Sequence, residues 1–515
     1  MGNDDYSNVL YQRSQKFYSE LNRLDTKQTI DDNSKSLSEK VYLKVYLTQV
    51  RNDCTYNIRL FNINNGQKYP LNEISDCKYQ DKTTVILNSR VIIRYFFEKN
   101  QPLLIGITRK KSNSLENREI NTTLGCIMGS RKNTLQKNVS FSRGNEILII
   151  QAEKLRQSED IIIIQFDISS PQKVYFNDIK NKMYYEVYSD NLLYRSECIN
   201  NYGKFNPVKI PLGFFKNNII NFKFCKNTRK VKGDFYANIQ ELVNGKLFNI
   251  IINGTPFQII SKCKLSKNYS FVDYLKAGIQ IRLSVAIDFT GSNGNPNEAT
   301  SLHYINGQQP NQYERAIVSC GNIVAYYNYD QLFPCFGFGA KINNQPTQIF
   351  NLNFKQDPNI QNIQGIIKAY HNAIRGVQLW GPTNFAPIIR SVNQIIKNSN
   401  NNLKYHILMI LTDGMIDDID NTIEELVEGS FLPLSVIIIG IGNADFSNMV
   451  QLDADENPLI NSRGVRAARD LVQFVPFLKY EKNPELLADE VLDEIPRQLI
   501  EYYEQNNLDP FKLIN

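Results

Sequence analysis

Short hydrophobic runs separated by polar turns fill the N-terminal half of the chain. The first series reads VYLKVYL, TYNIRLF, TTVILN, VIIRYFF and LLIGITR, and a second series extends from EILIIQA to KLFNIIING. Strand-length runs at a spacing of ~8–12 residues, with no helix-length pattern between them, indicate antiparallel β-sandwiches. The length of this part favours two sandwiches over one.

The pattern changes after Asp273. Runs that are apolar on both faces (IRLSVAIDF, YHILMILTDG and LPLSVIIIGIG) alternate there with amphipathic stretches at 311–327, 363–374 and 386–398. Strands buried on both faces that alternate with helices are typical of a doubly wound parallel sheet. Ligands of such sheets bind at the loops beyond the carboxyl ends of the strands.

These patterns predict a multidomain chain with four segments. Residues 1–38 form a polar tail with a short helix near 9–24, residues 39–152 and 153–274 form the two sandwiches, and residues 275–515 form the α/β part. No stretch approaches the ~18–20 apolar residues that cross a bilayer. The polar, acidic N-terminus does not read as a secretory signal, so we expect a cytoplasmic protein.

Charge and cysteine content narrow the possible functions. From residue 275 onward the chain has 17 Lys and Arg against 26 Asp and Glu, whereas residues 1–274 have 41 against 26. A basic front half suggests contact with a polyanion, either an anionic membrane or a nucleic acid, although a solvated Lys-rich surface is the simpler alternative. The eight cysteines form no C-x-x-C pair, which disfavours zinc-ribbon and RING sites.

Oxygen-bearing side chains follow two of the buried strands and a loop between helices. Asp288, Thr290 and Ser292 end the first strand, Thr383 lies in the sequence GPTNF, and Asp413 ends the third strand. Two carboxylates and three hydroxyls, without Cys or His, make a hard oxygen site suited to Mg²⁺, Mn²⁺ or Ca²⁺. A D-x-T-x-S run alone can merely cap a helix, but the three segments in this order favour a metal site.

Other polar residues near this site are predicted to be structural. His303 is isolated in the sequence from the other two histidines, which does not suggest a catalytic base. Asp417 and Asp418 are expected to cap a helix that begins near Thr422. Trp380 is expected to pack behind the Thr383 loop.

The ordered oxygen ligands closely resemble the metal-ion-dependent adhesion site of von Willebrand factor A (vWA) domains, and the surrounding text resembles the copine family. The motifs that carry the resemblance are VAIDFTGSNGNPNEATSLHYI, NQYERAI, FPCFGFGAKI, GPTNFAPII, ILTDG and RDLVQFVPF. The resemblance covers 275–505 densely. It implies two C2 domains ahead of the vWA-like part, which agrees with the two sandwiches inferred above.

The resemblance also implies roles for the site residues. Thr290, Ser292 and Thr383 would bind Mg²⁺ or Mn²⁺ directly, and Asp288 and Asp413 would hold the metal's water shell. A free coordination position would accept a carboxylate from a protein partner. The site would therefore bind a partner and not catalyse a reaction.

The C2-like segments depart from the family pattern, because the aspartates that bind Ca²⁺ in the family are mostly absent. In the second sandwich only Asp234 remains of the third loop, and Lys182 stands where the first loop would have its second Asp. Basic side chains oppose dication binding, so a Ca²⁺ response is left open, and they could meet lipid phosphates directly. The predicted lipid contacts are Arg109, Lys110, Lys111, Lys182, Lys226, Arg229, Lys230 and Lys232.

The sequence thus predicts a non-enzymatic, copine-like adaptor that is peripheral at the plasma membrane or other intracellular membranes. Its partners would be anionic phospholipid and a protein that supplies an acidic residue. A vWA-type scaffold with purely structural C2-like domains is the main alternative, and a ubiquitin ligase-related chain lacking its RING is a remote one. The sequence has no phosphate-binding glycine motif after a strand, and no aromatic-basic RNA motif, so neither a nucleotide enzyme nor nucleic-acid binding is expected.

Overall fold

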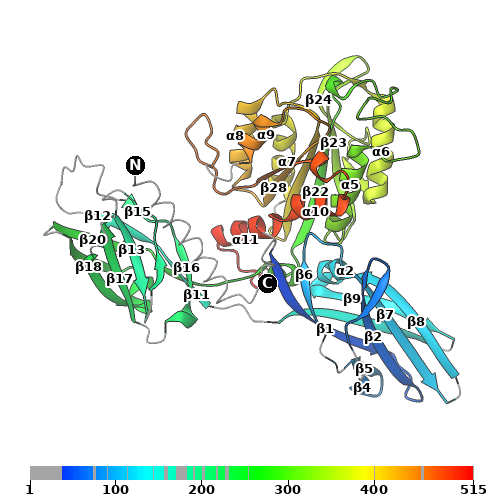
Figure 1. Cartoon of the computed structure of the whole chain (residues 1–515), viewed down its shortest axis with the longest axis horizontal. Coiled ribbons are helices and arrows are strands. Elements are labelled where there is room, and N and C mark those ends of the chain that lie inside the picture. Colours follow the sequence, from blue (N-terminus) through cyan, green and yellow to red (C-terminus); the bar gives the residue numbers. More distant parts are fainter. Residues whose placement is uncertain are drawn as a thin grey trace. The chain divides into compact units, whose positions relative to one another are not determined.

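The computed structural model describes residues 37–513 except 73–76, 88, 90, 113, 143, 156–159, 170–182, 190–191, 200–202, 216–218, 227–230, 253–254, 400 and 454–457. The helix predicted near 9–24 lies outside these residues. The chain divides into two compact units: residues 156–269 belong to one, and residues 30–155 together with 270–515 belong to the other (Figure 1). None of the helices in the described ranges is long and apolar enough to span a membrane.

Residues 37–155, the first β domain, consist of antiparallel strands in two sheets, in the orders β4-β5-β1-β10-β9 (with β6 also paired to β1) and β3-β2-β7-β8. In β1 the alternate residues Val41, Leu43, Val45 and Leu47 are buried, as expected for a strand with one face in a core. The strands are β1 Ser38–Thr48, β2 Thr55–Asn64, β3 Gln67–Pro70, β4 Cys77–Tyr79, β5 Thr84–Leu87, β6 Val91–Phe96, β7 Pro102–Lys111, β8 Ser114–Thr123, β9 Thr134–Phe141 and β10 Gly144–Lys154, with the short helix α2 Leu124–Gly129 and the 3₁₀ turn η1 Arg131–Asn133 between β8 and β9.

Residues 160–269, the second β domain, are also antiparallel, in the sheet orders β14-β13-β17-β18, β15-β12-β20-β19 and β16-β11-β21. Phe166 packs edge-on against Tyr185 and Phe222, which anchors an aromatic core. The antiparallel strands predicted for the N-terminal part are thus confirmed. The elements are β11 Asp160–Ile164, β12 Phe166–Ser169, β13 Met183–Tyr188, β14 Leu192–Arg195, β15 Gly203–Lys204, β16 Val208–Pro211, η2 Leu212–Phe214, β17 Ile219–Lys226, β18 Val231–Asn238, α3 Ile239–Val243, β19 Leu247–Ile252, β20 Thr255–Ser261 and β21 Lys264–Lys267.

Residues 270–513, the α/β region, are built on one sheet of order β24-β23-β22-β27-β28-β29, with β25 and β26 also paired to β23. The pairs β22–β23, β22–β27, β27–β28 and β28–β29 are parallel, and β24, β25 and β26 are antiparallel to β23. The strands are β22 Gln280–Asp288, β23 Leu332–Ile342, β24 Gln345–Asn351, β25 Asn359–Gln361, β26 Gln378–Leu379, β27 Lys404–Thr412, β28 Leu434–Gly440 and β29 Val472–Pro476.

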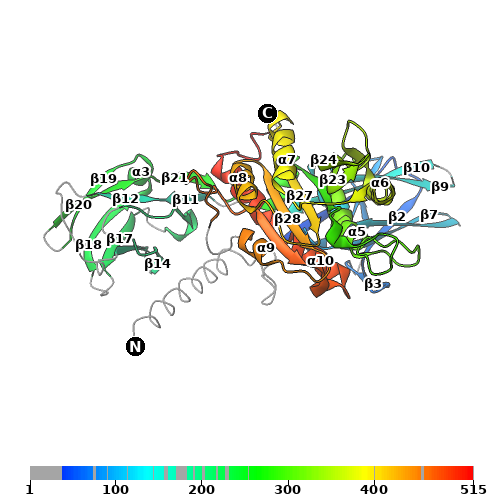
Figure 2. The same cartoon turned by 90° about the horizontal axis from the view of Figure 1, so that it is seen from above.

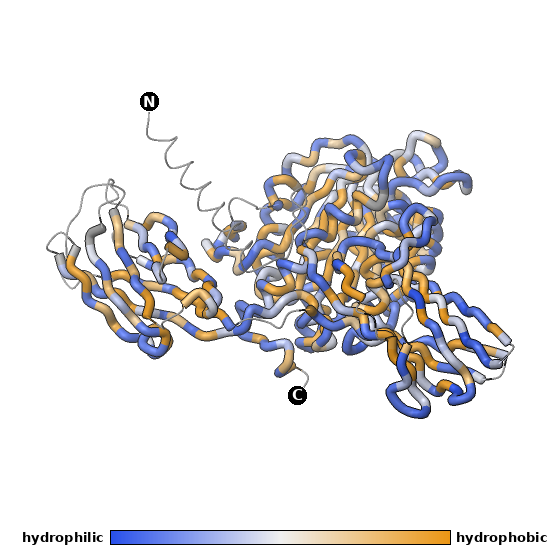
Figure 3. Tube along the Cα trace, turned by 60° about the horizontal axis from the view of Figure 1, so that its bottom comes forward, coloured by the Kyte–Doolittle hydropathy of each residue, from blue (hydrophilic) through white to orange (hydrophobic). Residues whose placement is uncertain are grey.

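Helices lie on both sides of this sheet (Figures 1 and 2). Apolar residues of α7, α8 and α9 pack with one face of the strands, and α5 packs near β22 on the other side. Hydrophobic residues concentrate along the strands between these helices, whereas many of the loops are hydrophilic (Figure 3). The helices are α4 Phe271–Lys276, η3 Gly291–Asn293, α5 Gln312–Ala325, α6 Asn362–Gly376, α7 Ala386–Ser399, α8 Ile419–Gly429, α9 Ser447–Leu452, η4 Phe477–Tyr480, α10 Pro484–Leu492 and α11 Ile495–Gln505.

Within their shared unit, the first β domain and the α/β region contact each other through buried side chains. The hydroxyls of Tyr95 and Tyr327 are 2.6 Å apart, and the ring of Phe97 packs against Tyr327 at a centroid distance of 4.9 Å. The Glu39 carboxylate accepts hydrogen bonds from the Ser270 hydroxyl and the Val272 amide. These buried polar and aromatic contacts join the two parts more firmly than exposed ion pairs would.

Candidate metal centre

The candidate site forms where β22 and β27 end side by side. The two strands are parallel, with Ile287 opposite Leu411, so Asp288 and Thr412 occupy neighbouring positions at the carboxyl ends. The next residue, Asp413, begins the loop after β27. The strand pattern in the sequence therefore placed these two carboxylates correctly, because parallel neighbours end at the same edge.

Four of the five predicted metal ligands are joined by direct hydrogen bonds. The Thr290 hydroxyl lies 2.6 Å from Asp288 Oδ1 and 2.9 Å from the Ser292 hydroxyl. Ser292 Oγ in turn donates to Asp413 Oδ1 at 2.9 Å. The other oxygen of Asp288 accepts from the Thr412 hydroxyl at 2.6 Å. The loop thus collects two carboxylates and two hydroxyls in one network.

Thr383, the fifth predicted ligand, is buried and is positioned through its backbone. Its N–H donates to Asp417 Oδ2 at 2.7 Å, and its carbonyl accepts from the Asp417 N–H at 2.9 Å. Upstream, the carbonyl of Trp380 accepts from the Gly291 N–H at 2.7 Å, which ties this loop to the Asp288 loop. The place of Thr383 is therefore defined by the two loops that flank it.

The expected role of Asp417 and Asp418 needs correction. Asp418 does precede α8, but its carboxylate oxygens accept hydrogen bonds from the N–H groups of Phe385 and Ala386, at the start of α7. Asp417 holds the Thr383 backbone. Sequence position near a helix start suggested capping of α8, whereas the acceptors are used across the fold on the ligand loop.

Asn293 and Tyr313 are site residues that the sequence patterns did not predict. Asn293 Nδ2 donates to Asp413 Oδ1 at 2.9 Å, and its Oδ1 accepts from the Tyr313 hydroxyl at 2.7 Å. Asn293 directly follows Ser292, which is a usable signal, but nothing in the sequence spacing links Tyr313 to this loop. Both residues fix the orientation of the Asp413 carboxylate.

His303 is structural, as predicted, and supports the loop from behind. Burial lowers the pKa of its imidazole to about 3, so the ring is neutral. Nε2 donates to the backbone carbonyl of Asp288 at 2.9 Å, and Nδ1 accepts from the Tyr370 hydroxyl at 2.8 Å. The tautomer follows because a carbonyl oxygen can only accept.

Trp380 is not packed behind the ligand loop, because 49% of its surface is exposed. Met415, which follows the Asp413 loop, is 55% exposed. A pocket of about 720 Å³ lies beside the metal loop and is lined by Gly291, Asn295 and Arg375, among others. Large exposed side chains beside a pocket are typical of surfaces that bind proteins.

The electrostatics of the site fit a divalent cation. Burial raises the pKa of both carboxyls, and the Asp288 charge raises that of Asp413 further. A hard dication would offset the cost of ionising two neighbouring buried carboxylates. Among the described residues, no group of three or more His, Cys, Asp and Glu could hold a metal, so a site here depends on the Thr and Ser hydroxyls as well.

Gly339 provides a direct test of this packing. It has a φ of +73°, and a Cβ placed on it would lie 2.3 Å from Cγ2 of Thr290. Gly339→Ala is therefore expected to displace Thr290 and weaken Mn²⁺ binding by at least about tenfold, with a loss of stability of about 1–3 kcal/mol. Mn²⁺ titration calorimetry and thermal melts would measure both effects. Gly213→Ala, at a position with no atom within 4 Å of the added Cβ, is the matched control; equal Mn²⁺ affinity in both variants would contradict the geometry.

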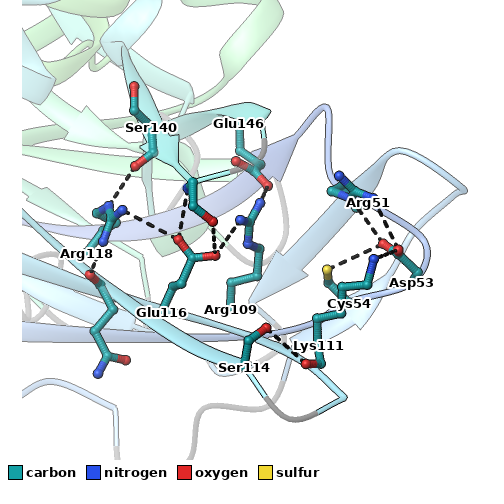
Figure 4. Close-up of polar contacts among 12 residues, drawn as sticks. Arg51, Asp53, Cys54, Arg109, Lys111, Ser114, Glu116, Arg118, Ser140 and Glu146 are labelled. Carbon is teal, nitrogen blue, oxygen red and sulfur yellow. Dashed lines mark hydrogen bonds and ion pairs between the residues drawn. The ribbon is translucent and has the colours of Figure 1, made fainter.

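The predicted lipid-contact residues divide into different groups. Residues 108–111 were predicted as a loop but lie at the end of β7, so their side chains alternate between the two faces. Arg109 is only 4% exposed, and its guanidinium binds Glu116 at 2.6 Å and Glu146 at 2.9 Å (Figure 4). The prediction that Arg109 contacts lipid is wrong, because its charge is already paired inside the domain.

The neighbouring lysines remain candidates to different degrees. Lys110 is exposed, whereas Lys111 forms an ion pair with Asp53 (Figure 4). Lys182, Arg229 and Lys230 lie outside the described residues. Lys226 and Lys232 belong to β17 and β18, and the structure describes only their backbone.

Comparison with known proteins identifies part of the α/β region. Solved structures similar to this chain include the manganese-loaded TRAP protein of Plasmodium vivax (15% identity, 39% of this chain, 70% of that chain, TM-score 0.26). They also include the SpRpn10 VWA domain (12%, 38%, 87%, 0.26) and the SMP domain with two C2 domains of Extended-Synaptotagmin 2 (10%, 44%, 56%, 0.17), with the values in the same order. The family model for copine matches residues 301–511. The chain therefore carries a copine domain at residues 301–511, and the resemblance to the copine family seen in its sequence motifs is confirmed.

Proposed function

We propose that this protein is a copine-like peripheral-membrane adaptor that binds a protein partner through a divalent metal at the end of β22 and β27. The observation that carries the proposal is the hydrogen-bonded convergence of Asp288, Thr290, Ser292 and Asp413. In this proposal the α/β region is a doubly wound, vWA-like domain. The two β domains are C2-like modules that bring the chain to anionic phospholipid.

The donor set suits Mg²⁺ or Mn²⁺, which would supply a positive centre able to coordinate a partner's carboxylate. Thr290, Ser292 and Thr383 would be its direct protein ligands, while Asp288 and Asp413 would orient bound water. Asn293 and Asp417 would position these groups through the hydrogen bonds described above. Trp380 and Met415 would then contact the partner around the metal, since both are exposed on the adjoining loops.

We infer that the metal serves binding and not catalysis. His303, the histidine hydrogen-bonded at this loop, is buried and neutral with both ring nitrogens engaged, so it is unsuited to transfer protons to a bound molecule. The location that fits this function is the cytoplasmic face of the plasma membrane or other intracellular membranes. Exposed basic residues such as Lys110, and those of the second β domain, would make the lipid contacts, with or without Ca²⁺.

A second candidate function is a vWA-type scaffold whose β domains are only structural. The internal pairing of Arg109 with Glu116 and Glu146, and of Lys111 with Asp53, favours it for the first β domain. Binding of the whole chain to anionic vesicles separates the two functions, because the scaffold would not bind them.

Metal-dependent recognition of a carboxylate can be measured by nuclear magnetic resonance. With Mn²⁺ kept below the protein concentration, the paramagnetic ion is expected to broaden the glutamate signals of the peptide acetyl-Gly-Glu-Gly-amide. The matched peptide with Gln in place of Glu should be unaffected, and Mg²⁺ should restore sharp lines by displacing Mn²⁺. Equal broadening of both peptides, or broadening that survives in Asp413→Asn, would contradict carboxylate binding at this site.

A further inference from the structure

A crevice of about 1040 Å³ lies where the first β domain meets the α/β region within their shared unit. Glu98, Asn100 and Ser130 line it from the first β domain, and Tyr326 and Asp489 line it from the α/β region. The Tyr326 hydroxyl donates to Asn100 Oδ1 at 3.4 Å, so the two walls already touch. This crevice is separate from the metal centre, and none of the predicted metal or lipid residues lines it.

Glu98 is an unusual group to find in such a place. It follows β6, directly after Phe97, whose ring is fixed against Phe271 and Tyr327, and only 1% of its surface is exposed. Apart from its own backbone N–H, no described group hydrogen-bonds either of its carboxylate oxygens. A buried carboxylate without a partner is costly, and such groups in native proteins usually mark a missing ligand, ion or water.

The surroundings add negative charge instead of neutralising it. Burial, followed by repulsion from Asp493 and Asp489, raises the pKa of Glu98 to about 7. Lys99 lowers that pKa, but its ammonium lies 3.8 Å from Asp489 and also rests over the ring of Phe96. The titratable groups that line the crevice are Glu98, Lys99, Cys126, Lys137, Tyr326, Tyr329 and Asp489.

The shape and the donor set indicate which cation would fit. Among the described residues no cluster of acidic, His and Cys side chains has the geometry to hold a metal. The crevice is also far larger than a bare ion requires. Its walls offer the Asn100 amide and the Tyr326 hydroxyl, which suit a ligand with several N–H donors and an apolar stem.

We propose that this crevice binds an organic cation, the ammonium or guanidinium group of a free amine or of a partner's basic side chain, with the Glu98 carboxylate as its main contact. The inference does not depend on the metal centre. It assigns a function to the only part of the described α/β–β junction where a charged group is buried without a partner residue. Since both walls contribute, a bound cation would also hold the two parts together.

The test uses the full chain, with agmatine as the free amine and acetyl-Lys-Gly-Lys-amide as the peptide, at pH 8 and constant ionic strength. Calorimetry is expected to give saturable binding of at least one probe. Tetramethylammonium, which has no N–H donor, should not bind. A peptide that binds more than about tenfold tighter than agmatine points to a protein partner, and the reverse points to a small amine.

Glu98→Gln should weaken binding of the probe at least about tenfold, and it should raise the melting temperature of the probe-free protein at pH 8 because it removes an uncompensated charge. Glu119→Gln, an exposed acid that pairs with Lys68, is the matched control and should change neither. Asp489→Asn, at the crevice wall, should weaken binding to a smaller extent, and it keeps the test valid if Glu98→Gln fails to fold.

Lowering the pH from 8 to 6 should weaken binding about tenfold, as Glu98 takes up its proton. Absence of saturable binding by both probes would overturn the proposal. Equal affinity of the wild type, Glu98→Gln and Asp489→Asn for a probe that does bind would overturn it as well, since the cation would then be bound elsewhere.

Discussion

Replacing Asp413 by Asn is expected to weaken Mn²⁺ binding by about 100-fold without unfolding the protein. The substitution removes one of the two buried charges that would offset the dication, and loss of such metal-site groups typically costs 10–100-fold in affinity. The amide oxygen of Asn can still accept the hydrogen bonds that Ser292 and Asn293 donate to Asp413 Oδ1. The loop should therefore keep its conformation while the metal affinity falls.

Titration calorimetry with Mn²⁺ measures this effect, and Trp380 offers a local signal. It is the only tryptophan in the chain and lies on the loop that pairs with Gly291, so Mn²⁺ should quench its fluorescence in the wild type. Asp357→Asn, in an exposed loop where the carboxylate accepts hydrogen bonds from nearby Asn359, is the control of equal charge. Wild-type Mn²⁺ affinity in Asp413→Asn would show that the metal site is wrongly placed.

Binding of the full chain to anionic vesicles is expected to persist in a Ca²⁺ chelator and to weaken as salt rises. Basic side chains near a membrane contribute about 1 kcal/mol each and are screened over a Debye length of ~8 Å at physiological ionic strength. Reversal of Lys226, Arg229 and Lys230 to Glu should therefore weaken binding by about 100-fold or more. Co-sedimentation with vesicles of increasing phosphatidylserine content measures the affinity.

The control reverses three exposed lysines of the α/β region, Lys355, Lys368 and Lys482, and gives the same change in net charge. It should bind vesicles much more tightly than the first triple variant. Binding that appears only on addition of micromolar Ca²⁺ would contradict the charge-based mechanism. Equal loss in the two variants would show that overall charge, and not this part of the second β domain, decides the interaction.

The sequence alone was sufficient for the architecture and for most of the metal centre. Runs such as YHILMILT are apolar on both faces, and only a strand in the middle of a sheet buries both faces. Because the chain alternates these runs with helical stretches, the carboxyl ends of β22 and β27 had to meet at one edge. Asp288 and Asp413 are the residues at those ends, so their proximity follows from local patterns.

Contacts between distant segments could not be predicted in this way. Arg109 occupies a basic run that resembles a lipid-binding loop, yet the pleat of β7 turns it inward to Glu146, 37 residues away. Asp418 precedes a helix, but it holds the start of α7 instead. In both cases the side chain satisfies a buried partner, which lowers the free energy more than an exposed role would.

Glu98 shows the same limit most clearly. Its sequence context, FFEKN, is an ordinary polar turn after a strand. Only the packing of Phe97 between the first β domain and the α/β region brings the neighbouring carboxylate into a buried crevice with Asp489. Periodicity and motif order determined the fold and the metal ligands because they depend on local pattern and chain direction. Burial and pairing of individual charges were decided by tertiary contacts, because the energy of a charge depends on the groups and solvent around it.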